Sequence, residues 1–140
     1  VTNINMYEIS YASKLKKINI ASKNPVYSSE DGVLYNKSKT AVYVVPTGRT
    51  TSVTLHKNVK TFAYLIAPSQ IRVKPSPDSI HYAYKDGVVY NKNLTRVIYA
   101  NKNITGAYTM PSTVTNINDS AFEDCTSLRI QFFLRRYGCQ

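Results

Sequence analysis

The chain has 140 residues, 43% of them hydrophobic, which is enough for one domain with a core. Lys and Arg outnumber Asp and Glu by 18 to 8, giving a net charge of +10, and the absence of an apolar run of about 18 residues excludes a membrane-spanning helix. Such a charge attracts polyanions, whether nucleic acid, sulfated or sialylated glycans, or acidic proteins. A Lys-rich and Asn-rich solvated surface without such a partner explains the composition equally well.

The N-terminal segment contains the first half of a repeat. Val1-Thr-Asn-Ile-Asn5 returns letter for letter as Val114-Thr-Asn-Ile-Asn118 near the end of the chain. It is followed by Leu15–Ile20, in which apolar residues alternate, and this pattern predicts a half-buried strand. Self-similarity over a long period is typical of stacked modules, which offer extended binding surfaces.

The middle of the chain contains a second repeat. Asp31-Gly-Val-Leu-Tyr-Asn-Lys returns as Asp86-Gly-Val-Val-Tyr-Asn-Lys, 55 positions later. In each copy a short polar stretch separates two β-branched and aromatic runs, which predicts two antiparallel hairpins. The paired runs are 32–36 with 41–45, and 87–91 with 96–100.

Four further segments, 52–55, 70–73, 107–110 and 128–132, share the alternating pattern of Leu15–Ile20. Because successive strand side chains point to opposite faces, an inward apolar set fixes an outward polar row. We take this row as the candidate binding face, with its cations forming a basic surface for an acidic protein or glycan. Besides Ser52, its members are Lys17, Asn19, Thr54, His56, Arg72, Lys74, Thr109, Arg129 and Gln131.

The segment Met110–Leu128 carries the most specific motif. Asp119 or Ser120 is placed to cap a short helical turn, with Phe122 and Cys125 one turn apart. The segment closely resembles the leucine-rich repeat pattern I-P-x-x-V-x-x-I-G-x-x-A-F-x-x-C-x-x-L of BspA-like surface proteins of mucosal bacteria and parasitic protists. Both Asp-Gly hairpins also resemble insertions between the repeats of that family. The chain departs from the pattern at Asn118, where the family prefers Gly, and at His56, which replaces the Pro found at Pro111.

This resemblance implies a leucine-rich-repeat solenoid that is mainly β with short helical turns, in which a parallel strand ladder carries two β-hairpin insertions. It covers nearly the whole chain. We therefore expect a single solenoid over 1–140, with about five rungs and repeat units of about 1–58, 59–113 and 114–140. Since the terminal units are incomplete, we expect a fragment of a longer protein. Members of the family are mostly secreted or cell-surface proteins associated with adhesion, and their motifs fix no ligand contact.

Residues suited to catalysis are sparse. His56 aligns with Pro111 and His81 with Val26, so neither histidine holds a recurring position. Two His and two Cys without a short spacing form no zinc signature, and no nucleotide-binding loop occurs among five glycines. We expect no enzyme, cofactor or metal.

Tyrosines are interspersed with Lys and Arg along the chain, a composition that also occurs in nucleic-acid binders. Here they recur in register, Tyr35 with Tyr90 and Tyr27 with Tyr82, which indicates packing between modules. Nucleic acid is therefore not the expected partner.

These patterns favour a non-catalytic binding module that mediates adhesion or protein–protein interaction, with a protein or anionic glycan on a host or neighbouring cell surface as its partner. The alternative is a structural component that self-associates through its solenoid ends, where the apolar edge Phe132–Leu134 needs a cap or a partner.

Two kinds of covalent modification are also open. Four acceptor sequons begin at Asn36, Asn93, Asn103 and Asn118, and the first two fall at hairpin turns that can accommodate a glycan. Cys125 is expected to be a buried thiol, although a bridge from it to Cys139 is an alternative.

Overall fold

The computed structural model describes residues 2–62, 65–123 and 125–131, with only the backbone described for Gln131. The chain forms two compact units, Val1–Ser79 and Ile80–Gln140, and each is described by itself. The expected apolar edge Phe132–Leu134 and the alternative bridge to Cys139 lie outside the described residues.

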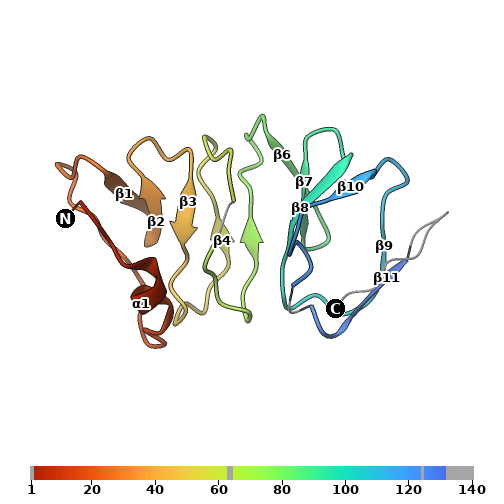
Figure 1. Ribbon diagram of the computed structural model, residues 1–140, viewed down its shortest axis with the longest axis horizontal. Coiled ribbons are helices and arrows are strands. Elements are labelled where there is room, and N and C mark those ends of the chain that lie inside the picture. The colour runs from red at the N-terminus through yellow and green to blue at the C-terminus, as the bar shows by residue number, and fades with distance from the viewer. Residues whose placement is uncertain (1, 63–64, 124, 132–140) are drawn as a thin grey trace. The chain divides into compact units, whose positions relative to one another are not determined.

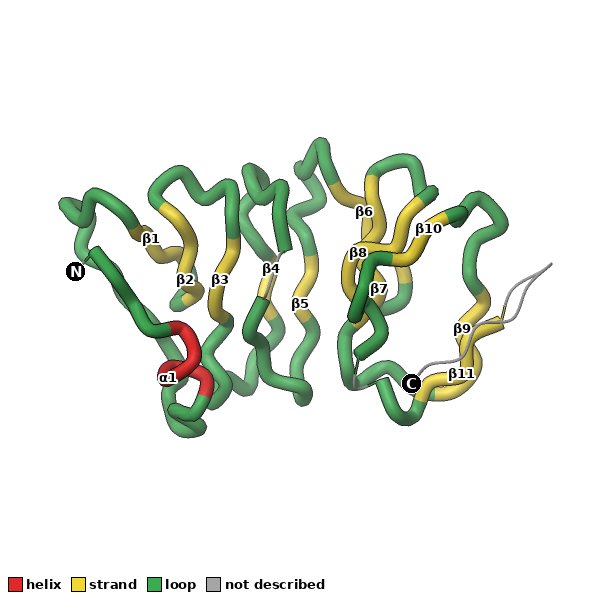
Figure 2. Tube along the Cα trace, in the orientation of Figure 1, coloured by secondary structure: helices red, strands yellow, loops and turns green. Residues whose placement is uncertain are grey.

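The first unit begins with a short helix, α1 (Met6–Ser10), shown in red in Figure 2. Asn5 caps it, because the Asn5 Oδ1 accepts a hydrogen bond from the backbone N–H of Glu8 at 3.2 Å. Half-buried Met6 and Ile9 pack against the core of this unit. The helix therefore has one face on the core and one in solvent.

The strand expected over Leu15–Ile20 is not formed as a regular strand. The N–H of Ile18 donates to the Gly32 carbonyl at 2.9 Å, and the N–H of Ile20 donates to the Ser29 Oγ at 2.8 Å. The segment therefore runs beside a hairpin turn, where its bonds are made to a carbonyl and a hydroxyl in place of a strand ladder. The expected alternation persists, since Ile18 and Ile20 are half-buried and Asn19 is exposed.

A three-stranded antiparallel sheet follows, made of β1 (Tyr27–Glu30), β2 (Val33–Asn36) and β3 (Val42–Val44) (Figure 1). The predicted hairpin corresponds to β2 and β3, and β1 is an additional strand. Asp31 and Gly32 form the β1–β2 turn with φ of 51° and 76°, a left-handed conformation that Gly adopts without steric cost.

The second unit contains the same sheet again, as β6 (Tyr82–Lys85), β7 (Val88–Asn91) and β8 (Arg96–Ala100). Tyr27 pairs with Asn36 in the first copy, and Tyr82 pairs with Asn91 in the second. Both copies have a register shift in the middle of the second strand. The sequence repeat is therefore a structural repeat.

One side-chain network explains why the repeated Asn and Thr specify the second turn. The Asn36 Nδ2 donates to the Thr40 Oγ1 at 2.9 Å, and the Asn36 Oδ1 accepts from the Ala41 N–H at 3.0 Å. Asn91 makes the same pair of bonds to Thr95 and Arg96, at 2.7 and 2.9 Å. Such local bonds replace backbone bonds that the turn cannot make.

Parallel pairing is present in both units but is short. Strand β4 (Val53–Thr54) pairs with β5 (Val73–Lys74), and β9 (Gly106–Thr109) pairs with β11 (Leu128–Gln131). In addition, β10 (Asn116–Ile117) adds in parallel to β8, and parallel bridges join Ala41 to Thr61 and Val44 to Ile66.

The expected architecture is therefore confirmed in part. The molecule is mainly β with little helix, and in the described residues its strands form four small sheets, two of them purely parallel, and not one clear parallel ladder. Val53 pairs with Val73, whereas Gly106 pairs with Leu128, so the chain between paired strands is longer in the second unit. The parallel turns of the two units are thus unequal in length.

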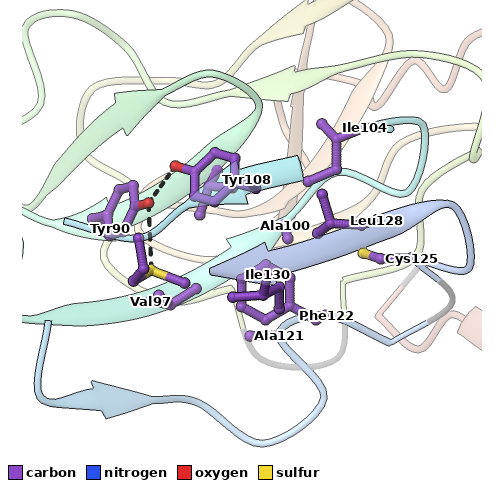
Figure 3. Close-up of a cluster of buried hydrophobic side chains, with 12 residues drawn as sticks. Tyr90, Val97, Ala100, Ile104, Tyr108, Ala121, Phe122, Cys125, Leu128 and Ile130 are labelled. Carbon is purple, nitrogen blue, oxygen red and sulfur yellow. Dashed lines mark hydrogen bonds between the residues drawn. The ribbon is translucent and has the colours of Figure 1, made fainter. Parts of the chain in front are cut away.

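Each unit has its own apolar core. In the first, Tyr27, Leu34 and Val44 are buried together. In the second, Figure 3 shows the hydroxyls of Tyr90 and Tyr108 directed at each other among aliphatic side chains. Phe122 and Cys125 are both buried, as expected, but the segment that carries them is a series of turns and not a helix.

Candidate binding surface

The predicted face is best defined on the parallel pair β4–β5. Thr54 lies directly opposite Lys74, and both side chains are exposed. Two backbone bonds flank this pair: Val53 N–H donates to the Arg72 carbonyl at 3.0 Å and Leu55 N–H to the Lys74 carbonyl at 2.8 Å. The pairing places a hydroxyl donor beside a cation on a fixed backbone.

Alternation along these strands keeps the polar residues outside. Val53, Leu55, Ile71 and Val73 are all at most 4% exposed and form the underlying core. A register slip of one residue would bury Lys74 and expose Val73, which the apolar layer prevents. Arg72, immediately before β5, is half-buried.

His56 lies just past β4 and is half-buried. Its backbone N–H donates to the Tyr35 hydroxyl at 3.1 Å, which fixes the chain after the strand. Burial raises the pKa of Tyr35 to about 12, so this hydroxyl is neutral at physiological pH. This contact positions the backbone, and the His56 Nδ1 accepts a hydrogen bond from the Asn58 N–H at 3.0 Å.

The second unit presents a related arrangement on β9–β11. Thr109 lies opposite Gln131, and Arg129 lies opposite Ala107. Thr109 and Arg129 are exposed, while Tyr108, Leu128 and Ile130 are buried behind them.

The two arrangements are related in part by the sequence repeat, because Thr109 holds, in its second copy, the position that Thr54 holds in the first. Lys74 lies opposite Thr54, whereas Gln131 lies opposite Thr109, so Arg129 is two residues before the counterpart of Lys74. Each unit therefore offers a cation and a hydroxyl on a parallel strand pair.

Lys17 and Asn19 are exposed, but in the described residues no strand pairing joins them to β4 or β5. Lys17 lies against the β1–β2 turn, where a Cβ added to Gly32 would be 3.1 Å from the Lys17 Cγ. These two residues thus belong to a separate part of the first unit's surface.

One basic residue, Arg49, is buried and pairs with groups inside the first unit. Arg49 is 7% exposed, and its guanidinium donates to the carbonyls of Thr51 and Asp31 and to the Asp31 carboxylate at 2.7 Å. It therefore stabilises the β1–β2 turn and adds nothing to an accessible basic face.

Sequence reasoning did not single out an exposed aromatic pair at α1. Tyr7 and Tyr11 are 69% and 68% exposed, with ring centroids 5.1 Å apart and ring planes at 80°. The Tyr11 hydroxyl donates to the Tyr7 hydroxyl at 2.7 Å. The signal that was available is the spacing of four residues, which places two side chains on one helix face.

The part of the chain that the structure describes contains no group of three or more His, Cys, Asp or Glu able to hold a metal ion. It also contains no helix with the length and apolarity needed to cross a bilayer.

No family model matches the chain, and no curated protein matches it. Among solved structures, the chain is similar to the pneumococcal vaccine antigen PcpA, with a TM-score of 0.51 and 21% identity over 64% of this chain and 23% of that one. It also matches a leucine-rich repeat protein from Eubacterium ventriosum, with 24% identity over 89% of this chain and 32% of that one, at a TM-score of 0.40. The chain spans less than a third of the length of either protein, and the likeness to the pneumococcal antigen shows a shared fold alone.

Proposed function

We propose that the chain is a non-catalytic binding module of a secreted or cell-surface, BspA-like leucine-rich repeat protein, and that it binds an acidic protein or anionic glycan through its exposed strand face. The observation that carries this proposal is the recurrence of a cation and a threonine, outside an apolar layer, on a parallel strand pair in each unit.

The chemistry of these residues suits an oxyanion. A threonine hydroxyl donates a hydrogen bond, and a Lys or Arg donates charge-assisted bonds to carboxylate or sulfate oxygens. The net charge of +10 adds long-range attraction, which speeds encounter with a negatively charged surface. The fold shared with a vaccine antigen supports a location at the cell surface.

The test separates the position of the charges from their number. One variant replaces Arg72, Lys74 and Arg129 with Gln, and the loss of these three charges lowers the net charge from +10 to +7. The matched control replaces three exposed lysines off the face, with two in the first unit and one in the second as in the test variant. These are Lys57, Lys60 and Lys85.

Both variants are applied to immobilised heparin and to cell-surface extracts over a salt gradient, with melting curves as the check on folding. We expect the face variant to elute at clearly lower salt than the control variant, because screening weakens its remaining contacts sooner. Equal elution of the two variants would show that net charge alone causes retention, and the proposed face would then be wrong.

A further inference from the structure

The α1 surface differs from the strand face because it exposes aromatic rings. Of the large hydrophobic side chains that the structure describes as exposed, Tyr7 and Tyr11 form a contacting pair. The core contacts of this helix are made by Met6 and Ile9, which leaves the two rings in solvent. Two solvated rings at about a right angle offer two ring faces to a partly apolar ligand that can bend around them.

This pair is held in place before any ligand arrives. The hydroxyl–hydroxyl bond and the edge-to-face contact fix the rings relative to each other. The bond to Tyr7 also raises the pKa of the Tyr11 hydroxyl. Rings that are already ordered lose less conformational entropy on binding.

The chain after α1 is anchored to the rest of the first unit. The Thr47 Oγ1 donates to the Ala12 carbonyl at 3.1 Å, and the Gly48 N–H donates to the Leu15 carbonyl at 2.9 Å. A Cβ on Gly48 would lie 2.7 Å from the carbonyl oxygens of Ser13 and Leu15, so the backbones are in close contact. Lys14 and Lys16, both exposed, therefore extend from a fixed segment that follows Tyr11.

The sequence that contains and follows the pair carries a net positive charge. Glu8 is the single acid in the sequence before Glu30, whereas four lysines, at 14, 16, 17 and 23, fall in the same stretch. Four positive charges and one negative charge leave a local balance of +3, which favours a ligand that carries acidic groups next to the part that covers the rings.

The size of the surface decides what kind of ligand fits. A fully exposed tyrosine offers about 150–250 Å², so rings that are 69% and 68% exposed present roughly 200–350 Å² together. A stable protein interface needs about 800 Å² on each partner, which is well beyond this area. The exposed area of the two tyrosines matches one or two sugar rings. The C–H faces of the sugars can stack on the tyrosine rings, and their hydroxyls can hydrogen-bond to the phenol groups.

We propose that Tyr7 and Tyr11, with Lys14 and Lys16, form a second binding site at α1 for an anionic saccharide chain. The sugar rings pack on the two tyrosines, and sulfate or carboxylate groups of the same chain pair with the lysines. This site is distinct from the strand face in residues and in chemistry, because aromatic stacking contributes here and charge dominates there.

The experiment titrates the 140-residue chain with a sulfated tetrasaccharide and follows the backbone and tyrosine-ring resonances of α1 by NMR. We expect Tyr7→Ala with Tyr11→Ala to weaken binding about tenfold, as the loss of an aromatic stacking contact does elsewhere. Tyr7→Phe with Tyr11→Phe keeps the rings and should stay within about threefold of the parent. Lys14→Gln with Lys16→Gln should remove most of the salt dependence, whereas Lys57→Gln with Lys60→Gln should not.

Two further measurements keep this test separate from that of the strand face. The variant in which Gln replaces Arg72, Lys74 and Arg129 should show the same saccharide-induced shifts at α1 as the parent, whether or not it binds heparin more weakly. A peptide of glutamates serves as the probe for an acidic protein partner. The proposal would be overturned if the saccharide left the α1 resonances in place or if the double Ala variant bound with unchanged affinity. It would also be overturned if the glutamate peptide caused equal shifts at α1.

Discussion

Replacing Arg49 with Ala removes the interaction that most directly ties the β1–β2 turn to the rest of the first unit. The guanidinium is almost fully buried and donates to two backbone carbonyls, those of Asp31 and Thr51, as well as to the Asp31 carboxylate. In the Ala variant both carbonyls lose a charged donor, and the left-handed Asp31 loses its restraint.

The cost follows from these contacts. A hydrogen bond to a charged group contributes about 1.5–3 kcal/mol. The Asp31 side chain is 60% exposed, so its ion pair contributes less than about 1 kcal/mol. Because water reaches part of the vacated space, we expect Arg49→Ala to lower the free energy of unfolding by about 2–4 kcal/mol. The melting midpoint should fall by roughly 10 °C or more.

The assay combines urea unfolding, followed by far-UV circular dichroism, with amide hydrogen exchange that compares β1–β2 with β6–β7. Exchange should accelerate in the first unit and stay unchanged in the second. Asp31→Asn is the matched control, since it keeps the carbonyl and tolerates a positive φ, and it should cost less than about 1 kcal/mol. A loss below about 0.5 kcal/mol for Arg49→Ala, or an equal loss for Asp31→Asn, would refute the reasoning.

Three further predictions concern stability. Burial raises the pKa values of Tyr35, Tyr82 and Tyr99 to about 12, whereas tyrosine in the unfolded chain has a pKa of about 10. The free energy of unfolding should therefore be constant below about pH 9. It should fall as the pH rises from about 10 towards 12, because the unfolded chain then loses these protons first. Urea midpoints measured against pH test this, and a flat profile to pH 12 would contradict it. Tyr35→Phe leaves the part-buried His56 N–H without its acceptor and should cost about 1–2 kcal/mol, and a neutral result would show that water replaces the hydroxyl. Gly48→Ala places a Cβ 2.7 Å from backbone atoms and should cost about 1–3 kcal/mol. In Gly106→Ala the added Cβ meets no atom within 4 Å. That variant should lose only the about 1–2 kcal/mol that a residue other than Gly costs at a positive φ. Crystal structures of both variants check this contrast, which fails if the backbone at Ser13–Leu15 does not move in the first.

Much of the local structure was readable from the sequence because it depends on local chemistry. The β-branched and aromatic runs on either side of a short polar stretch predicted both hairpins, and the Asn36–Thr40 and Asn91–Thr95 side-chain bonds show how the turns between them are held. Alternation predicted which side chains of β4, β5, β9 and β11 are buried, because the strand period is two.

Features that depend on strand pairing or on residues far along the chain were missed. Strands β1 and β6 begin with Tyr27 and Tyr82, but their other residues include Ser, Glu and Lys, so the propensity signal was weak and pairing with the next strand decides their structure. The burial of Arg49 depends on Asp31, which lies in an earlier turn of the chain. No local pattern identifies that pair.

One substitution between the repeats shows how a tertiary contact changes with a single residue. The Tyr35 hydroxyl accepts the N–H of His56, and the equivalent position in the second unit is Pro111, which has no N–H. There the equivalent hydroxyl, on Tyr90, bonds with the Tyr108 hydroxyl, and Val53 holds the position equivalent to Tyr108 in the first unit. The departure from the family pattern at His56 is thus matched by a different hydrogen-bond partner in each unit.

The central claim is that an exposed, basic strand face in each unit binds an anionic partner. Its most direct test is an NMR titration of the whole chain with a sulfated oligosaccharide and, separately, with an acidic peptide, each at two salt concentrations. We predict salt-sensitive shifts of the amides around Thr54 and Lys74 and around Thr109 and Arg129 with at least one of the two probes. The claim would be contradicted if the resonances of both strand pairs stayed in place with both probes, at concentrations where binding is detected elsewhere on the chain.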